Sequence, residues 1–305
     1  MNKLDYNYTS PDQPEFDPTV FRIQASQIST FFDYTNQFFR QKLLGEEGFK
    51  GNTASVLGTC IHYCAEQFIK NDKLSAEDKQ EIYDYITEQS QALLDLVNSD
   101  EIRAQITPMW SELRNYIKAN PVSLAEPFVQ VEILPGITVG GSIDAIRAVD
   151  GTVATSIEQL ANKQVELIDW KTCGAQSRIT DSSMTKAYHW QLLVYAYVLK
   201  KLYNINVTKI TNVFISRSDI NRVSEKTGKP LKDYPSEITP ISKPVLPEDL
   251  DFIESLIKLV AHSVQSFILN PGPQRALLAQ DWRLISHTDP LPFTAVLSSQ
   301  PEEEI

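Results

Sequence analysis

The stretch VELIDWKT, residues 165–172, decides the fold because it places two polar side chains on one face of an apolar strand. Side chains alternate between the two faces of a strand, so Asp169 and Lys171 project together while Ile168 and Trp170 point the other way. The stretch GGSIDAI, residues 140–146, adds Asp144 after two glycines. Glycines allow another backbone or a substrate to approach closely. Two carboxylates beside an ammonium form a minimal site for metal-dependent phosphodiester hydrolysis.

The same residues have a plainer interpretation, which is a surface Asp–Lys pair on a half-buried strand. The surrounding sequence favours a site. An apolar run, Val165 to Ile168, leads into Asp169, and a hairpin pattern carries Asp144 onto a neighbouring strand. We therefore interpret Asp144, Asp169 and Lys171 as residues of a catalytic site rather than as a structural surface pair.

Four ordered motifs in the chain resemble those of the PD-(D/E)XK nuclease superfamily, in its RecB-like branch. GTCIHYCAE (58–66) resembles the helical G-T-x-x-H-x-x-x-E motif, GSIDA supplies the aspartate, IDWKT supplies the acidic residue and the lysine, and QLLVYAYVL (191–199) resembles the helical Q-x-x-x-Y motif. Each motif is weak alone. Their order and spacing make the resemblance strong over nearly half the chain.

The resemblance implies an α/β fold, with a restriction-endonuclease-like core of a central mixed β-sheet flanked by helices and a helical insertion. It also implies Mg²⁺ or Mn²⁺ held by His62, Asp144, Asp169 and the backbone carbonyl of Trp170. Lys171 would position the attacking water.

Two helical pairs extend this expected site. His62 and Glu66 are four residues apart and share a helix face, so Glu66 could support a metal-binding imidazole, although a His–Glu surface pair has the same spacing. Gln191 and Tyr195 form a polar stripe on an otherwise apolar helix. Such a stripe is commonly the edge of a core, but the resemblance implies contact with the substrate backbone near the scissile phosphate.

The three cysteines predict neither disulfides nor a metal cluster. Their odd number and irregular spacing fit a reducing compartment. Many RecB-like relatives carry a four-cysteine iron–sulfur cluster, but here Asp33 and Tyr34 stand where the upstream cysteine is expected, and no cysteine follows Cys173. We expect no iron–sulfur cluster and interpret the cysteines as small buried residues.

The charge of the chain is unevenly distributed. The formal net charge is −11, yet residues 163–232 hold 12 Lys and Arg against five Asp and Glu. Phosphate attraction is local, so this basic segment could contact DNA despite the acidic remainder, although an ordinary solvated lysine-bearing face would give the same count. The N-terminus lacks a signal-peptide pattern and we find no apolar run of membrane-spanning length, so we expect a cytoplasmic protein of a bacterium or an infected host cell, without membrane contact.

The length and patterning predict one domain with extensions. We expect a polar arm over 1–22, a nuclease domain over 23–290, and an acidic tail over 291–305. Within the domain we expect a helical insertion at about 71–125 and a mobile basic loop at about 217–247. Other expected elements are helices over 28–39, 61–69 and 250–269, a helix capped by Ser75, and a hairpin of strands 128–134 and 137–149.

These observations predict a Mg²⁺- or Mn²⁺-dependent DNA exonuclease of phage or bacterial recombination and repair. The alternatives are a non-catalytic DNA-binding or scaffold subunit and a structure-specific or restriction-type endonuclease. Because the chain has no phosphate-cradling P-loop, a helicase would have to be a separate partner, as would a single-strand annealing protein.

Overall fold

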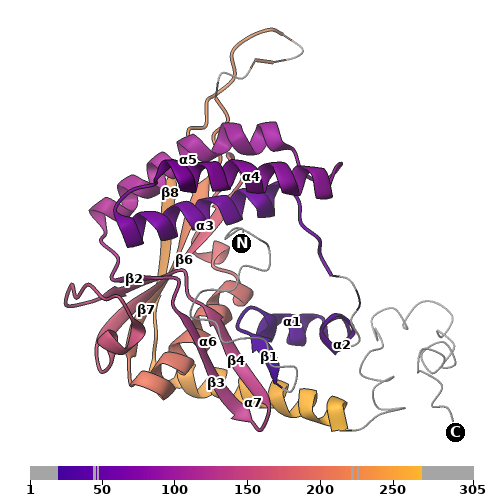
Figure 1. The fold of residues 1–305 in the computed structure, drawn as a ribbon, viewed down its shortest axis with the longest axis vertical. Helices are drawn as coiled ribbons and strands as arrows, with labels where there is room; N and C mark the ends of the chain where they lie inside the picture. Colours follow the sequence, from indigo (N-terminus) through magenta and orange to yellow (C-terminus); the bar gives the residue numbers. More distant parts are fainter. Residues whose placement is uncertain (1–19, 44–45, 47, 221–222, 225–226, 270–305) are drawn as a thin grey trace, which may run out of the picture.

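A computed structural model describes residues 20–43, 46, 48–220, 223–224 and 227–269. It has mixed α/β architecture with two sheets (Figure 1). The larger sheet has the order β2 (Leu124–Ala125), β5 (Ala145–Ala148), β6 (Gln164–Cys173), β7 (Asn206–Ser216) and β8 (Ile238–Pro244). The smaller has the order β1 (Phe21–Gln24), β4 (Ile137–Ser142) and β3 (Phe128–Leu134).

The centre of the larger sheet is the parallel pair β6 and β7, with Asp169 opposite Asn212. Both strands contain six consecutive buried residues, Val165–Trp170 in β6 and Ile210–Ile215 in β7, as expected for strands covered on both faces. Strand β5 pairs antiparallel with β6, and β8 pairs antiparallel with β7. The mixed sheet confirms the expected fold class.

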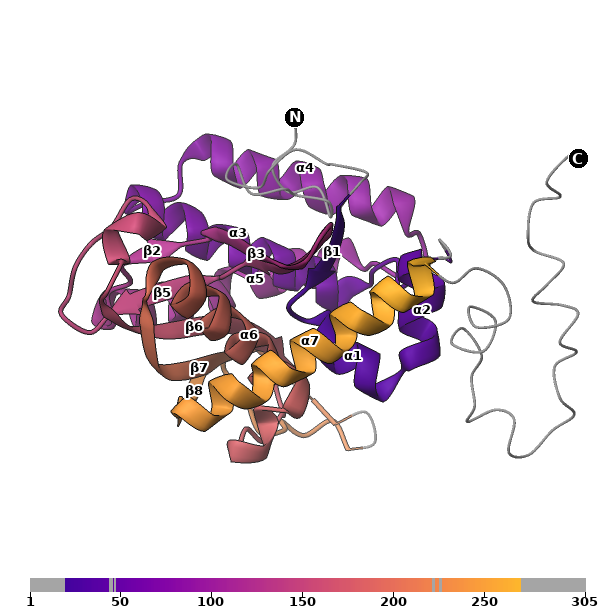
Figure 2. The same ribbon diagram turned by 90° about the horizontal axis from the view of Figure 1, so that it is seen from below.

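Helices cover the larger sheet on both faces. One layer consists of α3 (Thr53–Asn71), α4 (Ala76–Ala92) and α5 (Ser99–Ala119), and packs on Ile168, Trp170 and Val213. The other contains α1 (Gln27–Asp33), α2 (Thr35–Leu43), α6 (Lys186–Tyr203) and α7 (Pro247–Leu269). Figure 2 shows α7 running diagonally across α6 and α1. The short helices η1 (Ile157–Leu160) and η2 (Asp181–Ser183) lie in connections.

The start of α4 follows the expected capping pattern. The Ser75 hydroxyl accepts a hydrogen bond from the Asp78 backbone N–H, and the Asp78 carboxylate accepts one from the Ser75 N–H. Helices α4 and α5 fall within the range expected for the insertion. The helix expected over 28–39 is instead two helices, because the backbone of Tyr34 leaves the helical region at φ −146° and ψ 56°.

The strand expected over 137–149 is interrupted at Ile143 and Asp144, and its two halves belong to different sheets. At the break, the Ile143 N–H donates to the carbonyl of Pro127, and the Glu126 N–H donates to the carbonyl of Asp144. The bend frees Asp144 from regular pairing and turns its side chain toward β6.

Two expected boundaries differ from the structure. Strand β1 begins at Phe21, inside the range expected as an arm, because it pairs with β4. The range expected as a mobile loop, 217–247, contains β8, which extends the sheet as an edge strand. The tail at 291–305 and most of the arm lie outside the described residues.

Helix α7 also corrects the sequence reading for membrane segments. It is the helix, within the described residues, that is long and apolar enough to cross a membrane by length and composition. Its apolar face, including Ile253, Ile257 and Val264, is buried against the core. Core helices of soluble proteins commonly meet the same criterion. Cys60 and Cys64 are buried as expected, whereas Cys173 is partly exposed.

Candidate active site

Asp144 and the strand β6 meet at the interruption between β4 and β5. One Asp144 carboxylate oxygen, Oδ2, accepts a hydrogen bond of 2.8 Å from the backbone N–H of Trp170. Burial opposes ionisation of this carboxyl, but His62 and Lys171 outweigh it and hold the pKa of Asp144 below its usual value. The side chain is therefore a fixed carboxylate beside Asp169 and Lys171.

Asp169 is held from two sides. Its side chain is 4% exposed and lies 2.8 Å from the Lys171 Nζ. Asn212, fully buried on β7, donates from Nδ2 to Asp169 Oδ2 at 2.6 Å. Burial and the neighbouring Asp144 raise the pKa of Asp169, although Lys171 opposes the change. The sequence analysis missed Asn212, because only the register of β6 and β7 places it there.

Lys171 carries its charge into a largely enclosed site. Burial tends to lower the pKa of its amine, but the carboxylates of Asp169 and Asp144 raise it above the usual lysine value. The Nζ also lies 4.7 Å from the ring centroid of Tyr188. Lys171 is therefore an ammonium at neutral pH, which suits a donor and electrostatic role rather than a proton acceptor.

His62 joins the helical layer to the sheet. Its Nε2 lies 2.8 Å from the carbonyl oxygen of Trp170, and its Nδ1 lies 3.3 Å from Asp144 Oδ2. Burial lowers the pKa of this imidazole, but the charge and hydrogen bond of Asp144 more than compensate, so the pKa is raised. Of the four groups expected to share a metal, His62 therefore contacts two directly, the Asp144 carboxylate and the Trp170 carbonyl.

Glu126 belongs to the same cluster, although the sequence analysis did not select it. Ligand atoms of His62, Glu126 and Asp144 all lie within 4.8 Å of one another. Burial and the nearby Asp144 and Glu66 raise the pKa of Glu126 well above its usual range. Its backbone adopts a left-handed conformation, φ +50°, which turns the chain between β2 and β3. A Glu-Pro pair before a hairpin is too common a pattern to have identified it.

Glu66 and the polar stripe of α6 lie at the edge of the cluster. The Glu66 side chain is 5% exposed and accepts a hydrogen bond of 2.8 Å from Lys70. Burial and the carboxylates of Asp144 and Asp169 raise the pKa of Tyr195, while a hydrogen bond with Gln191 opposes the change. A Cβ atom at Gly141 would lie 3.0 Å from the Tyr195 hydroxyl, so the glycine admits this ring beside Asp144.

Comparison with known proteins agrees with this geometry. A sequence model of the PD-(D/E)XK nuclease superfamily matches residues 22–265. The chain belongs to this superfamily. The match covers the break that carries Asp144, the strand that carries Asp169 and Lys171, and the helices that carry His62 and Tyr195.

Solved structures similar to this PD-(D/E)XK protein include a candidate exonuclease from Eubacterium rectale, with 10% identity, a TM-score of 0.44, and coverage of 81% of this chain and 80% of that one. The exonuclease LHK-Exo in complex with dAMP has 12% identity, a TM-score of 0.32, and coverage of 74% and 99%. LHK-Exo alone, an alkaline exonuclease from Laribacter hongkongensis, has 11% identity, a TM-score of 0.30, and coverage of 70% and 94%. No curated protein matches the sequence.

The residues present fit the divalent metal that PD-(D/E)XK nucleases use. An imidazole nitrogen and carboxylate oxygens are donors that first-row divalent cations accept, whereas Mg²⁺ prefers oxygen alone. Burial is the main cause of the raised pKa of Glu126, and the charge of Asp144 adds to it. A divalent ion would allow both to be ionised.

Proposed function

We propose that this protein is a metal-dependent DNA exonuclease. The observation that carries the proposal is the convergence of the His62, Glu126 and Asp144 ligand atoms within 4.8 Å, beside the buried Asp169–Lys171 pair. A nuclease of this superfamily needs both parts, a metal site and a cation directed at the phosphate. Incubation of end-labelled linear DNA with the purified protein and Mn²⁺, read out by product length, tests the proposal.

We assign the metal to His62, Glu126, Asp144 and Asp169, with the carbonyl of Trp170 as a further ligand. When bound, the ion would lower the pKa of a coordinated water and neutralise charge on the phosphate oxygens. Asn212 holds the Asp169 carboxylate in place through its 2.6 Å hydrogen bond. The Trp170 N–H does the same for Asp144.

Lys171 orients the attacking water and donates to the developing charge on the phosphate. Its raised pKa keeps the proton on Nζ during this step. We propose that Gln191 and Tyr195 orient the substrate strand, because their hydrogen bond fixes the Tyr195 hydroxyl beside Asp144. Glu66 supports the site electrostatically, and Lys70 balances its charge.

His62→Ala and Glu126→Gln are each expected to raise the Mn²⁺ concentration for half-maximal activity by about tenfold or more. Loss of one ligand removes part of the metal affinity, and tenfold corresponds to about 1.4 kcal/mol of binding free energy. The measurement is a metal titration of the cleavage rate, with Mg²⁺ in parallel. Because Mg²⁺ prefers oxygen donors, His62→Ala should impair Mn²⁺-supported cleavage more than Mg²⁺-supported cleavage.

A matched control for this titration is His189→Ala. This imidazole is on α6, and burial together with Lys243 lowers its pKa, in contrast to that of His62. Unchanged metal dependence in His62→Ala would mean that His62 has only a structural role.

The exonuclease assignment rests on the contacts that tie the helical insertion to the sheet near the site. The Glu101 carboxylate of α5 lies 2.7 Å from Arg217, and the Gln105 side chain exchanges two hydrogen bonds with the backbone of Ser218. These contacts tie α5 to the chain just beyond β7, next to the end of β6 that carries Lys171. Such a bridge favours a strand that enters from a terminus.

We therefore expect linear DNA to be degraded at least tenfold faster than covalently closed circles, at the same metal and salt concentrations. The assay compares a plasmid before and after linearisation. Equal rates would favour an endonuclease, and cleavage of neither would favour a non-catalytic DNA-binding subunit.

We further propose a role in recombination or repair in a bacterial or infected cell, with a helicase or an annealing protein as partner.

A further inference from the structure

A cavity lies on the side of helix α3 that faces away from the candidate active site. Cys64 and Phe68, which line this cavity, each lie two residues beyond His62 and Glu66. Two residues correspond to about 200° around an α-helix, so the two pairs face opposite sides. The cavity, of about 470 Å³, is open to solvent and is lined by residues of α3, α4, α5 and the connection between α3 and α4. It is separate from the metal cluster but only a helix width, about 10 Å, from it.

The cavity is strongly basic in an otherwise acidic protein. Five cations line it, against the single carboxylate of Asp72; they are Lys73, Lys79, Arg103, Arg114 and Lys118. All five are exposed, and no ion pair involves any of them within the part of the chain that the structure describes. Five cations with one nearby carboxylate repel one another, so an anionic ligand would stabilise this arrangement.

Aromatic rings alternate with these cations. Tyr83 is 52% exposed, and the Arg103 guanidinium lies 6.0 Å from its ring centroid. Trp110 contacts Phe68 edge to face, with centroids 5.5 Å apart. The Lys118 ammonium lies 5.8 Å from the Phe68 ring. An exposed ring beside unpaired cations offers a stacking surface together with phosphate contacts.

We propose that this cavity binds one nucleotide unit of single-stranded DNA, with a base against Tyr83 and phosphates against Arg114 and Lys118. The volume lies within the range of about 300–1,000 Å³ that is typical of small-ligand sites. Aromatic platforms combined with basic grooves are the usual means of binding single strands without sequence preference. The inference rests on DNA being the substrate, and it adds a site that holds the strand outside the active site.

The test measures binding without cleavage. Lys171→Ala protein in EDTA is titrated into fluorescent oligo-dT and into an abasic strand of the same length, at several salt concentrations. Adding Tyr83→Ala should weaken oligo-dT binding at least fivefold and leave the abasic strand nearly unaffected. Adding Arg114→Ala with Lys118→Ala should weaken both ligands and reduce the salt-dependence slope by about 1.4, since each phosphate contact on a single strand contributes about 0.7.

The matched control is Lys200→Ala with Lys258→Ala, which removes the same charge from α6 and α7. The proposal would be overturned if the cavity variants bound oligo-dT as tightly as the parent protein. It would also be overturned if the control variant lost as much oligo-dT affinity as the cavity variants. Polyglutamate binding as tightly as oligo-dT would overturn it in favour of an acidic protein partner. The binding measurements need no cleavage. Failure of the exonuclease assignment would therefore be seen separately, because linear DNA would stay intact in the Mn²⁺ assay.

Discussion

Lys171→Ala and Asp169→Asn are each expected to lower the cleavage rate at least 100-fold in protein that still folds and binds DNA. The Lys171 Nζ lies 2.8 Å from the Asp169 carboxylate in a site where both side chains are largely buried. Charges act most strongly where water is excluded, so these groups stabilise the transition state more than the bound substrate. A 100-fold loss corresponds to about 2.7 kcal/mol of barrier height.

The measurement is single-turnover cleavage of end-labelled linear DNA at saturating Mn²⁺. Asp169→Asn preserves the shape of the side chain and removes its charge, so loss of activity would report chemistry rather than packing. The matched control is the more exposed pair Lys163 and Asp150, which are 2.7 Å apart and lie away from the site. Lys163→Ala should retain full activity. More than about a tenth of the wild-type rate in either site variant would contradict the assignment, since tenfold is only about 1.4 kcal/mol.

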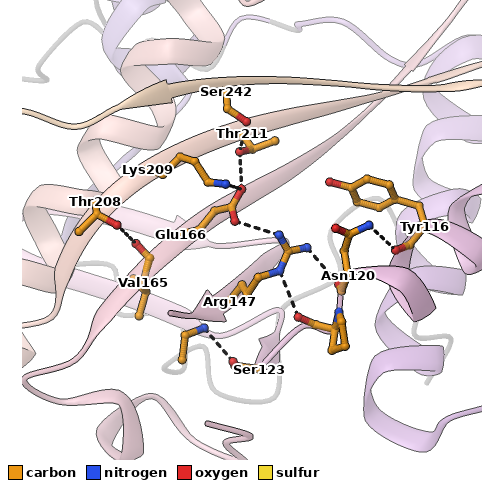
Figure 3. Close-up of polar contacts among 12 residues, drawn as sticks. Tyr116, Asn120, Ser123, Arg147, Val165, Glu166, Thr208, Lys209, Thr211 and Ser242 are labelled. Carbon is orange, nitrogen blue, oxygen red and sulfur yellow. Dashed lines mark hydrogen bonds and ion pairs between the residues drawn. The ribbon is translucent and has the colours of Figure 1, made fainter. Parts of the chain in front are cut away.

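Arg147→Ala is expected to destabilise the protein by about 3 kcal/mol, as is typical when one member of a buried ion pair is removed. Figure 3 shows the network around Glu166, whose side chain is 7% exposed. Arg147 lies 2.9 Å from Glu166 and donates to the backbone carbonyls of Asn120 and Pro121. The guanidinium therefore joins the end of α5 to β5 and β6.

Loss of Arg147 leaves Glu166 with two remaining partners. Thr211 donates to Glu166 Oε1 at 2.5 Å, and Lys209 lies 3.1 Å away but is 46% exposed. A half-exposed lysine cannot replace a mostly buried guanidinium that donates to Glu166 and to two backbone carbonyls. The carboxylate would therefore remain buried with incomplete compensation, and two backbone carbonyls would lose their donor.

Urea denaturation of wild type, Arg147→Ala and Lys209→Ala measures this effect. Lys209→Ala is the control, and it should cost less than about 1 kcal/mol because exposed ion pairs contribute little. At a temperature where Arg147→Ala is folded, its cleavage rate should match wild type, because Arg147 does not contact the site residues described above. A loss of less than about 1 kcal/mol in Arg147→Ala would show that the network is not a major source of stability.

The sequence was sufficient to predict the parts of the site that follow local periodicity. Asp169 and Lys171 share a strand face, and His62 with Glu66 shares a helix face, because side-chain direction repeats every two or every 3.6 residues. The strand expected over 137–149 was wrong for a related reason. Periodicity continues through Asp144, whereas the actual break depends on hydrogen bonds from Trp170 and Glu126, which lie elsewhere in the chain.

Local sequence therefore determined the mixed α/β class, the ordered motifs, and which side chains of each element point together. Only the tertiary structure brought Glu126 to His62, and Asn212 to Asp169 across the β6–β7 register. It also collected cations from α4, α5 and the connection between α3 and α4 around one cavity. These residues are far apart in the chain, and their meeting depends on strand order and helix packing, which arise from the summed burial of the whole core rather than from any short pattern.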